Sequence, residues 1–127
     1  MTDLPDALNH QMSELLGSGW RVDAASRTAH AQDNSWRHAL PAAVALPGTI
    51  AQVQAIVRAC RAHRIPLVAR GAGTGTTGAA VPSRGGVLLS LARMDAIVDI
   101  TPANRSAVVQ PGVLNGQLQQ ALAPHGL

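Results

Sequence analysis

Apolar residues near the N-terminus recur at spacings of three and four, as on the buried face of an amphipathic helix. This pattern covers residues 4–16 and stops at Gly17 and Gly19. Residues 21–37 are polar and show no periodicity, which is typical of a linker or an extended arm. We therefore predict that residues 1–37 form an N-terminal helix followed by an arm.

Short apolar runs separated by turns begin near residue 38. Val44 to Leu46 predict a buried strand. Thr49 followed by Gln52 has the spacing of a capping box, and the apolar positions after it predict a helix that ends before Pro66. Residues 67–69 then predict another strand, so this region begins as a β-α-β unit. The predicted inner face of the helix comprises Ile50, Val53, Ile56, Val57 and Cys60.

The C-terminal third of the chain predicts more short elements. Strands are expected at residues 87–91, 96–100 and 107–110. A turn at residues 102–105 joins the last two strands, and Asn115 can cap a final helix. The predicted fold class is therefore α+β, with a small mixed β-sheet flanked by helices and with residues 38–127 as one unit.

Between two predicted strands lies a segment with four glycines and three threonines in nine residues. Regular elements do not tolerate so many glycines, so a loop is predicted. Successive backbone N–H groups without side chains can form a nest for phosphate oxygens, and the threonine hydroxyls add donors. A phosphate-binding loop is therefore favoured over a flexible surface loop. Its candidate binding residues are Arg70, Gly71, Ala72, Gly73, Thr74, Gly75, Thr76, Thr77 and Gly78; Arg70 would serve as a phosphate-binding cation or in a structural ion pair.

Two well-known nucleotide sites have similar glycine spacing. Gly73, Gly75 and Gly78 match GxGxxG, and Asp95 lies twenty residues after Gly75, as in a Rossmann site. That site needs a helix directly after the loop, whereas Pro82, two glycines and a predicted strand follow here. A P-loop is excluded because the chain has no lysine.

Composition limits the expected partners and compartment. The sequence pI of 11.1 is typical of nucleic-acid binders, but the net charge is only +3 and all ten basic residues are scattered arginines. With Trp20 and Trp36 as the only aromatic residues, predicted as isolated anchors of the arm, base stacking has little support. The longest apolar runs are four or five residues, far below the roughly 20 that cross a bilayer. We expect no nucleic-acid partner, no transmembrane segment and no secretory signal.

The reactive side chains carry no catalytic pattern. Cys60 is the only cysteine, which excludes an internal disulfide, and its place on the predicted helix face favours core packing. The five histidines lack metal-ligand spacing, so no metal is expected. Asp95 and Asp99 flank a strand and are interpreted as turn or surface residues. The expected compartment is the cytoplasm, with peripheral attachment to the inner membrane left open.

Several separated segments match a known family in the same order along the chain. They are residues 70–78, 85–89, 94–95, 109–113 and 118–126. Together they resemble the FAD-linked oxidases of the vanillyl-alcohol oxidase type, which share the PCMH-type FAD-binding domain. Within that family it resembles D-lactate dehydrogenases and the glycolate oxidase flavoprotein subunit, and the similarity extends from about Asp33 to Leu127.

The resemblance implies FAD as the cofactor. Loop 70–78 would wrap the pyrophosphate through backbone amides, and Pro111 and Gly112 would approach it from a neighbouring strand end. Covalent members carry a flavin-linking histidine at the position matched here by Thr74, so noncovalent FAD is expected. Residues 38–127 would be the N-terminal half of the FAD-binding domain. The remaining FAD and cap domains would belong to the parent chain or a partner subunit.

The implied activity is oxidation of a D-2-hydroxy acid of the lactate, glycolate or 2-hydroxyglutarate type. A hydride would pass to flavin N5 and electrons onward to an unidentified acceptor. No catalytic residue is expected here, because in the family the residues that handle the substrate lie beyond position 127. Two alternatives stay open: a flavin oxidase of an alcohol, sugar or amine, and a non-enzymatic nucleotide-binding module. Asp33-Asn34-Ser35 is interpreted as a structural segment, with cofactor contact as the alternative.

Overall fold

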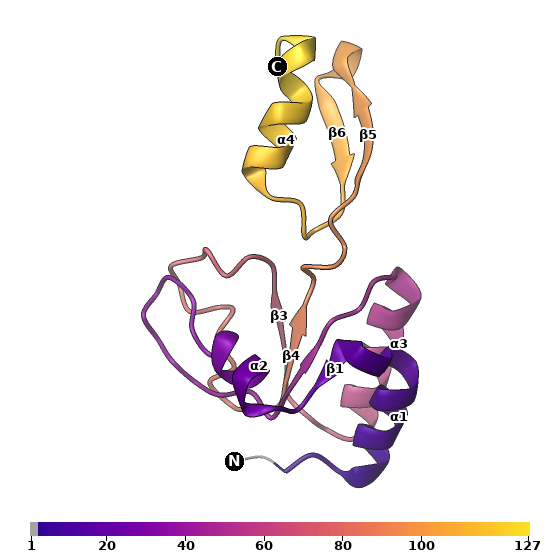
Figure 1. Cartoon of the computed structure of the whole chain (residues 1–127), viewed down its shortest axis with the longest axis vertical. Coiled ribbons are helices and arrows are strands. Elements are labelled where there is room, and N and C mark those ends of the chain that lie inside the picture. Colours follow the sequence, from indigo (N-terminus) through magenta and orange to yellow (C-terminus); the bar gives the residue numbers. More distant parts are fainter. Residues whose placement is uncertain (1–2) are drawn as a thin grey trace.

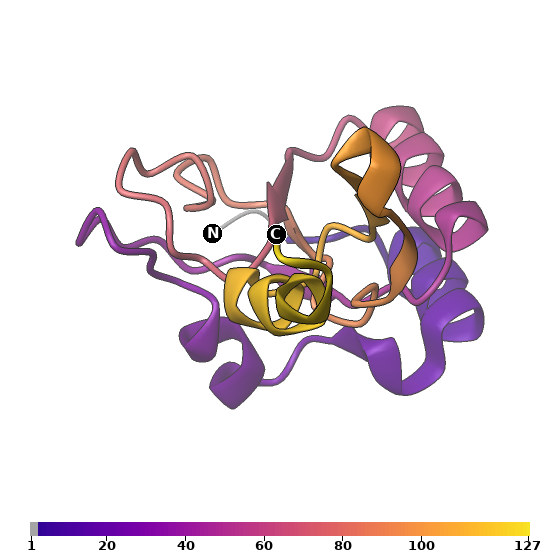
Figure 2. The same ribbon diagram turned by 90° about the horizontal axis from the view of Figure 1, so that it is seen from above.

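The computed structural model describes residues 3–127 and has two parts that follow each other along the chain (Figure 1). The larger part holds a four-stranded sheet with three helices, and the smaller holds a two-stranded hairpin with one helix. The hairpin and its helix stand at one end of the molecule, away from the larger sheet (Figure 1). Figure 2, a view from above, places the C-terminal helix over the middle of the larger part.

The first helix confirms the N-terminal apolar stripe. Helix α1 spans Asp6–Leu16, and its Leu8 and Met12 are completely buried. The helix ends at Gly17, whose φ of 52° lies in the left-handed region that glycine adopts without strain. A short turn leads to strand β1, Trp20–Arg21.

The prediction of an irregular arm over residues 21–37 is wrong in part. Residues Ala24–Ala29 form helix α2, which Asp23 caps by accepting a hydrogen bond from the Ser26 N–H at 2.8 Å. None of the six residues of α2 is buried, so this helix has no apolar face to reveal it in the sequence. Trp36 is not an anchor of the fold, since 85% of its surface is exposed.

The larger sheet is mixed and contains the predicted β-α-β unit. Its strands have the order β1-β2-β4-β3, and β1 is antiparallel to a parallel trio. The trio consists of β2, Ala43–Ala45; β3, Leu67–Arg70; and β4, Val87–Ser90. Strand β4, the last of them in the chain, lies between β2 and β3.

Helix α3, Ile50–Ala62, connects β2 to β3 and begins as predicted. The Thr49 hydroxyl accepts from the Gln52 N–H at 3.2 Å, and the Gln52 side chain accepts in turn from the Gly48 N–H at 2.8 Å. The predicted inner face is too wide, because Ile50 is 67% exposed. No helix formed by residues 3–127 is long and apolar enough to cross a membrane.

The core lies between one face of the sheet and helices α1 and α3. Its side chains are aliphatic or sulfur-containing apart from Trp20, which is 8% exposed. The indole N–H of Trp20 donates to the Asn9 side chain at 3.3 Å. Val44 and Leu88 alternate with the core-facing residues of β2 and β4 and are also fully buried, so both faces of the central strands are covered. The core cluster comprises Leu8, Met12, Leu16, Trp20, Ala43, Ala45, Ile56, Ala59, Cys60, Val87 and Leu89.

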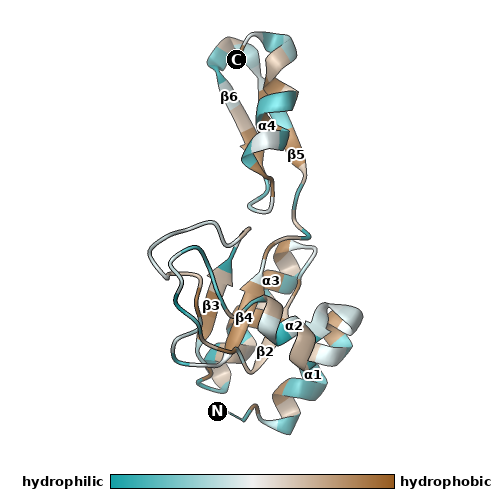
Figure 3. Cartoon of the chain, turned by 60° about the vertical axis from the view of Figure 1, so that its left-hand side comes forward, coloured by the Kyte–Doolittle hydropathy of each residue, from teal (hydrophilic) through white to brown (hydrophobic). Residues whose placement is uncertain are grey.

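The smaller part has no buried core of its own. Strands β5, Ile97–Thr101, and β6, Ser106–Val109, form an antiparallel hairpin, and helix α4 spans Asn115–Leu122. None of the residues in these three elements is buried. Hydrophobic stretches of the hairpin are visible in Figure 3, and Val98 is 64% exposed. This part therefore carries apolar surface that nothing in residues 3–127 covers.

Candidate functional site

The glycine-rich loop begins at the C-terminal end of β3 and reaches β4 without forming a helix. Residues 71–86 contain only turns, bends and irregular backbone. A Rossmann arrangement is therefore excluded, because it places a helix N-terminus on the phosphates. Since β3 and β4 are parallel, the loops that follow them leave the same edge of the sheet, and the Leu91 N–H donates to the Arg70 carbonyl there at 2.9 Å.

The glycines of the loop differ in backbone conformation and in the space around them. Gly73 and Gly78 have φ values of 74° and 81°, which side chains rarely allow. Gly75 has no positive φ, and a Cβ built on it would meet nothing within 4 Å. A Cβ at Gly75 would thus point into open space, which leaves room for a phosphate group beside the backbone of the loop. On this ground the loop has room for the pyrophosphate of FAD.

Arg70 makes a contact that neither sequence interpretation included. Its Nη1 donates to the backbone carbonyl of Gln32 at 2.7 Å. A Cβ at Gly73 would overlap the Arg70 guanidinium, so the glycine lets the loop fold over this side chain. Arg70 therefore links the start of the loop to a segment almost forty residues earlier.

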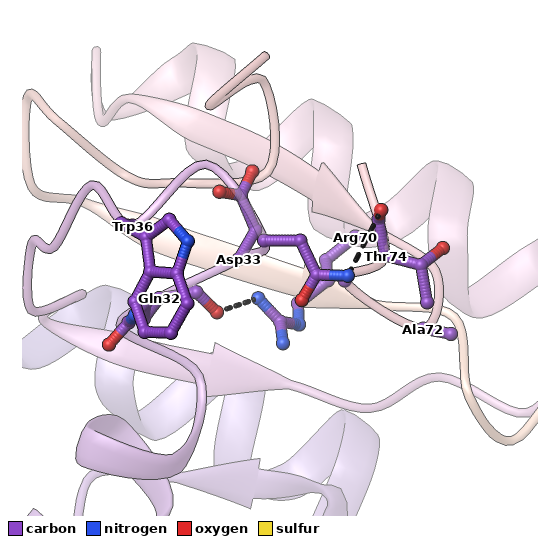
Figure 4. A pocket seen from close by; sticks show the side chains of 8 residues that line it. Gln32, Asp33, Trp36, Arg70, Ala72 and Thr74 are labelled. Carbon is purple, nitrogen blue, oxygen red and sulfur yellow. Dashed lines mark hydrogen bonds between the residues drawn. The ribbon is translucent and has the colours of Figure 1, made fainter. Parts of the chain in front are cut away.

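A cleft of about 380 Å³ lies beside the loop (Figure 4). Asn34 and the loop meet across it, where the Asn34 side-chain amide donates to the Thr74 carbonyl at 3.4 Å (Figure 4). The exposed Trp36 stands at this cleft with a left-handed φ of 63°. The cleft is lined by Gln32, Asp33, Asn34, Trp36, Arg70, Ala72, Gly73 and Thr74.

A second cleft, of about 230 Å³, joins the loop to the smaller part of the molecule. The Pro111 carbonyl lies 3.7 Å from the position of a Cβ on Gly71. A Cβ on Gly112 would overlap the carbonyl of Met94, which accepts from the Gly112 N–H at 2.8 Å. Pro111 and Gly112 thus lie beside the loop. The lining residues are Gly71, Ala72, Ala92, Asp95, Gly112, Leu114 and Gln117.

Asp33 is a buried charge at the first cleft, with 5% of its surface exposed. Hydrogen bonding to the Ser35 hydroxyl is the main cause that lowers the pKa of Asp33 below 3.8, assisted by the N–H groups of Ser35 and Ala80 and the charge of Arg70. Its Oδ1 accepts from the Ser35 N–H at 2.9 Å. Its Oδ2 makes no hydrogen bond of ordinary geometry within the described chain. Asp33 is therefore ionised at neutral pH.

The structure places six of the predicted site residues at the two clefts. Arg70, Gly73 and Thr74 line the first, Gly71 and Gly112 line the second, and Ala72 lines both. The other five line neither cleft: Gly75, Thr76, Thr77, Gly78 and Pro111. The sequence interpretation missed Gln32, Trp36, Leu114 and Gln117 as lining residues, because nothing in their local spacing distinguishes them.

Cys60 lies in the core, away from both clefts. Burial raises the pKa of its thiol to about 11, so it carries almost no thiolate at neutral pH. Core packing, as predicted, is its role. Within residues 3–127, no three histidine, cysteine or carboxylate side chains gather closely enough to hold a metal ion.

Known proteins are similar to this chain in sequence and in fold. The FAD binding domain family matches residues 41–127. The glycolate oxidase subunit GlcD of Escherichia coli strain K12 is 52% identical over 87 residues, which cover 68% of this chain and 17% of that protein. The D-2-hydroxyglutarate dehydrogenase of Stutzerimonas stutzeri is 42% identical over 129 residues, covering 100% of this chain and 27% of that protein. The chain thus spans about a quarter or less of these relatives.

The fold also matches a solved structure. The crystal structure of p-cresol methylhydroxylase superposes with a TM-score of 0.80 and 28% sequence identity, covering 98% of this chain and 26% of that chain. The predicted α+β fold of the PCMH type is therefore confirmed. The chain belongs to the FAD binding domain family.

Proposed function

We propose that this chain is the FAD-binding part of an oxidoreductase that oxidises a D-2-hydroxy acid of the lactate, glycolate or 2-hydroxyglutarate type. The observation that carries the proposal is the loop after β3, whose backbone faces open space at Gly75 and whose start borders two clefts. The relatives named for glycolate oxidation and D-2-hydroxyglutarate dehydrogenation support the substrate class.

The chain's own residues would bind the cofactor and keep it in place. Backbone N–H groups of residues 71–78 would hold the pyrophosphate, with the Thr74 hydroxyl as a further donor. Gly112 would line the second cleft, and Pro111 would lie beside Gly71 at the start of the loop. The two clefts meet at Ala72, which suits a ligand that extends on both sides of its phosphates.

The flavin would supply the redox chemistry by accepting a hydride at N5 and passing electrons to an acceptor. We assign no residue of this chain to proton transfer; those residues belong to the remaining FAD and cap domains, in the same chain or in a partner subunit. We further propose that these domains cover the apolar surface of residues 97–127.

The FAD is noncovalent, because Thr74 stands at the position where covalent members carry histidine. Denaturation of the holoprotein should therefore release all of the FAD.

Substitution of Gly75 tests the loop assignment most directly. In the full chain, Gly75→Val places a side chain in open space, so it strains nothing in the protein but occupies the space assigned to phosphate. We expect FAD affinity, measured by quenching of flavin fluorescence, to fall about tenfold or more, with unchanged apoprotein stability. Gly116→Val in α4 is the matched control, because a Cβ there also meets nothing within 4 Å.

Gly73→Val is a weaker test, because its side chain would overlap Arg70 whether or not FAD is bound. Unchanged FAD affinity in Gly75→Val would refute the loop assignment.

Stopped-flow reduction of the bound flavin tests the substrate class. D-2-hydroxy acids should bleach the flavin absorbance, whereas reduction only by alcohols, sugars or amines would refute the proposed D-2-hydroxy acid substrate.

A further inference from the structure

Residues 32–37, here called the brace, touch the glycine loop at its start, middle and end. At the start, the Gln32 carbonyl accepts from Arg70 at 2.7 Å. In the middle, the Asn34 amide donates to the Thr74 carbonyl at 3.4 Å. At the end, Gly78 packs so closely on Ser35 and Arg37 that a Cβ would lie 2.8 Å from the Arg37 Cδ. Figure 4 draws the first two contacts as dashed lines.

The brace is itself a closed turn with its own hydrogen bonds. The Asp33 carboxylate accepts from the Ser35 N–H at 2.9 Å, and the Ser35 hydroxyl accepts from the Arg37 N–H at 3.2 Å. The turn holds Trp36 at a φ of 63°, a costly conformation for a bulky residue. Such a strained conformation persists only where the surrounding hydrogen bonds fix the backbone. The brace is therefore rigid enough to hold the loop in one conformation.

A loop with four glycines loses much conformational entropy when it becomes ordered around a ligand. Contacts that order the loop beforehand remove part of that loss from the binding step. The brace supplies such contacts from a distant part of the chain. It leaves the space in front of Gly75 free, so ordering the loop does not block the site.

We propose that the brace preorganises the glycine loop for phosphate binding, with Asn34 as the positioning residue for its middle. Asn34 is exposed, and within residues 3–127 its side chain bonds only to a backbone carbonyl of the loop, so it acts through the loop. The assignment of phosphate as ligand rests on the proposed function, whereas the ordering of the loop does not.

The test compares Asn34→Asp with the unaltered full chain. Aspartate keeps the shape of asparagine but lacks the N–H donor, and its charge repels the Thr74 carbonyl. Before FAD is added, we expect faster hydrogen exchange of the amides of residues 71–80 and unchanged exchange in β2 and β4. FAD affinity should fall about tenfold.

Asn9→Ala is the matched control, since it removes another side-chain amide contact, the one between α1 and Trp20 of β1. This variant should lose global stability and keep normal loop exchange and FAD affinity. Asn34→Asp with unaltered loop exchange, or with faster exchange spread over the whole chain, would overturn the brace. If the unaltered protein fails to bind FAD while Asn34→Asp still speeds hydrogen exchange in the loop, the proposed function is refuted and the ordering of the loop by the brace is supported.

Discussion

Trp20 and Trp36 differ completely in environment although both were expected to anchor the arm. Trp20 is 8% exposed, lies in the core and donates a hydrogen bond to Asn9. Trp36 is 85% exposed and has a left-handed backbone. Neither environment is encoded in the flanking polar residues: each depends on what the rest of the fold brings next to the indole. Single residues in this irregular region were therefore beyond local sequence analysis.

Truncation of the two tryptophans should have opposite consequences. Trp20→Ala should lower the free energy of unfolding by about 3 kcal/mol or more, because it leaves a cavity in the core. At position 36 glycine should be better than alanine: Trp36→Gly should exceed Trp36→Ala in stability by about 1 kcal/mol, because only glycine adopts the left-handed backbone freely. Denaturant unfolding of the three variants measures both effects, and equal stability of the two variants at position 36 would contradict the assigned strain.

Cys60 should be a structural thiol with a pH signature. Burial raises the pKa of the Cys60 thiol from 9.0 to about 11, so the thiol loses its proton at lower pH in the unfolded chain than in the folded one. The free energy of unfolding should therefore fall as pH rises from 9.0 to about 11. Cys60→Ala should remove this dependence and cost on the order of 1 kcal/mol. Thiol reagents should modify the native protein only as fast as it unfolds; rapid modification of folded protein would show that the thiol is accessible.

Individual elements were predicted well where an apolar run marks them, whereas α2, which has a cap but no apolar face, was missed. The parallel strands and α3 follow from short aliphatic runs and from the spacing of Thr49 and Gln52. The loop follows from its glycines. The strand order does not, because nothing local indicates that β4 enters between β2 and β3. The contacts of Gln32 and Asn34 with the loop join residues 38 and 40 positions apart, and no local pattern reports them.

Helix α2 depends on its cap and should respond to acid. The pKa of Asp23 is lowered below 3.8, chiefly by the Ser26 N–H that it accepts from. The cap is therefore fully effective above 3.8 and is lost as pH falls through the lowered folded value. Asp23→Asn should cap without this titration. An NMR titration of the Ser26 amide should give a midpoint below 3.8 in the unaltered chain and none in the variant; a midpoint above 3.8 would contradict the cap.

The whole molecule combines a packed sheet layer with a part whose strands and helix contain no fully buried residue. Both faces of β2 and β4 are covered, whereas β5, β6 and α4 contain no buried residue. The two clefts lie at the edge of the larger sheet, and the second one reaches the smaller part through Gly112. Stability and binding surface are thus unevenly distributed along the chain.

Hydrogen exchange should reveal this difference. In the 127-residue chain, amides of β5 and β6 should exchange much faster than those of β2 and β4, because few apolar contacts oppose local opening. In the full-length protein the covering domains that we propose should slow the exchange of β5 and β6. Equal protection of both sheets in the 127-residue chain would show that the smaller part is stable alone.

The central place of β4 has a consequence for synthesis on the ribosome. Strands β2 and β3 leave the ribosome before β4. They do not pair with each other, and each of them pairs with β4. The parallel trio can therefore form only after Val87–Ser90 has left the exit tunnel. Because the glycine loop joins β3 to β4, its two ends become fixed only when β4 is inserted. The sheet and the candidate cofactor loop are thus completed in the same step of translation.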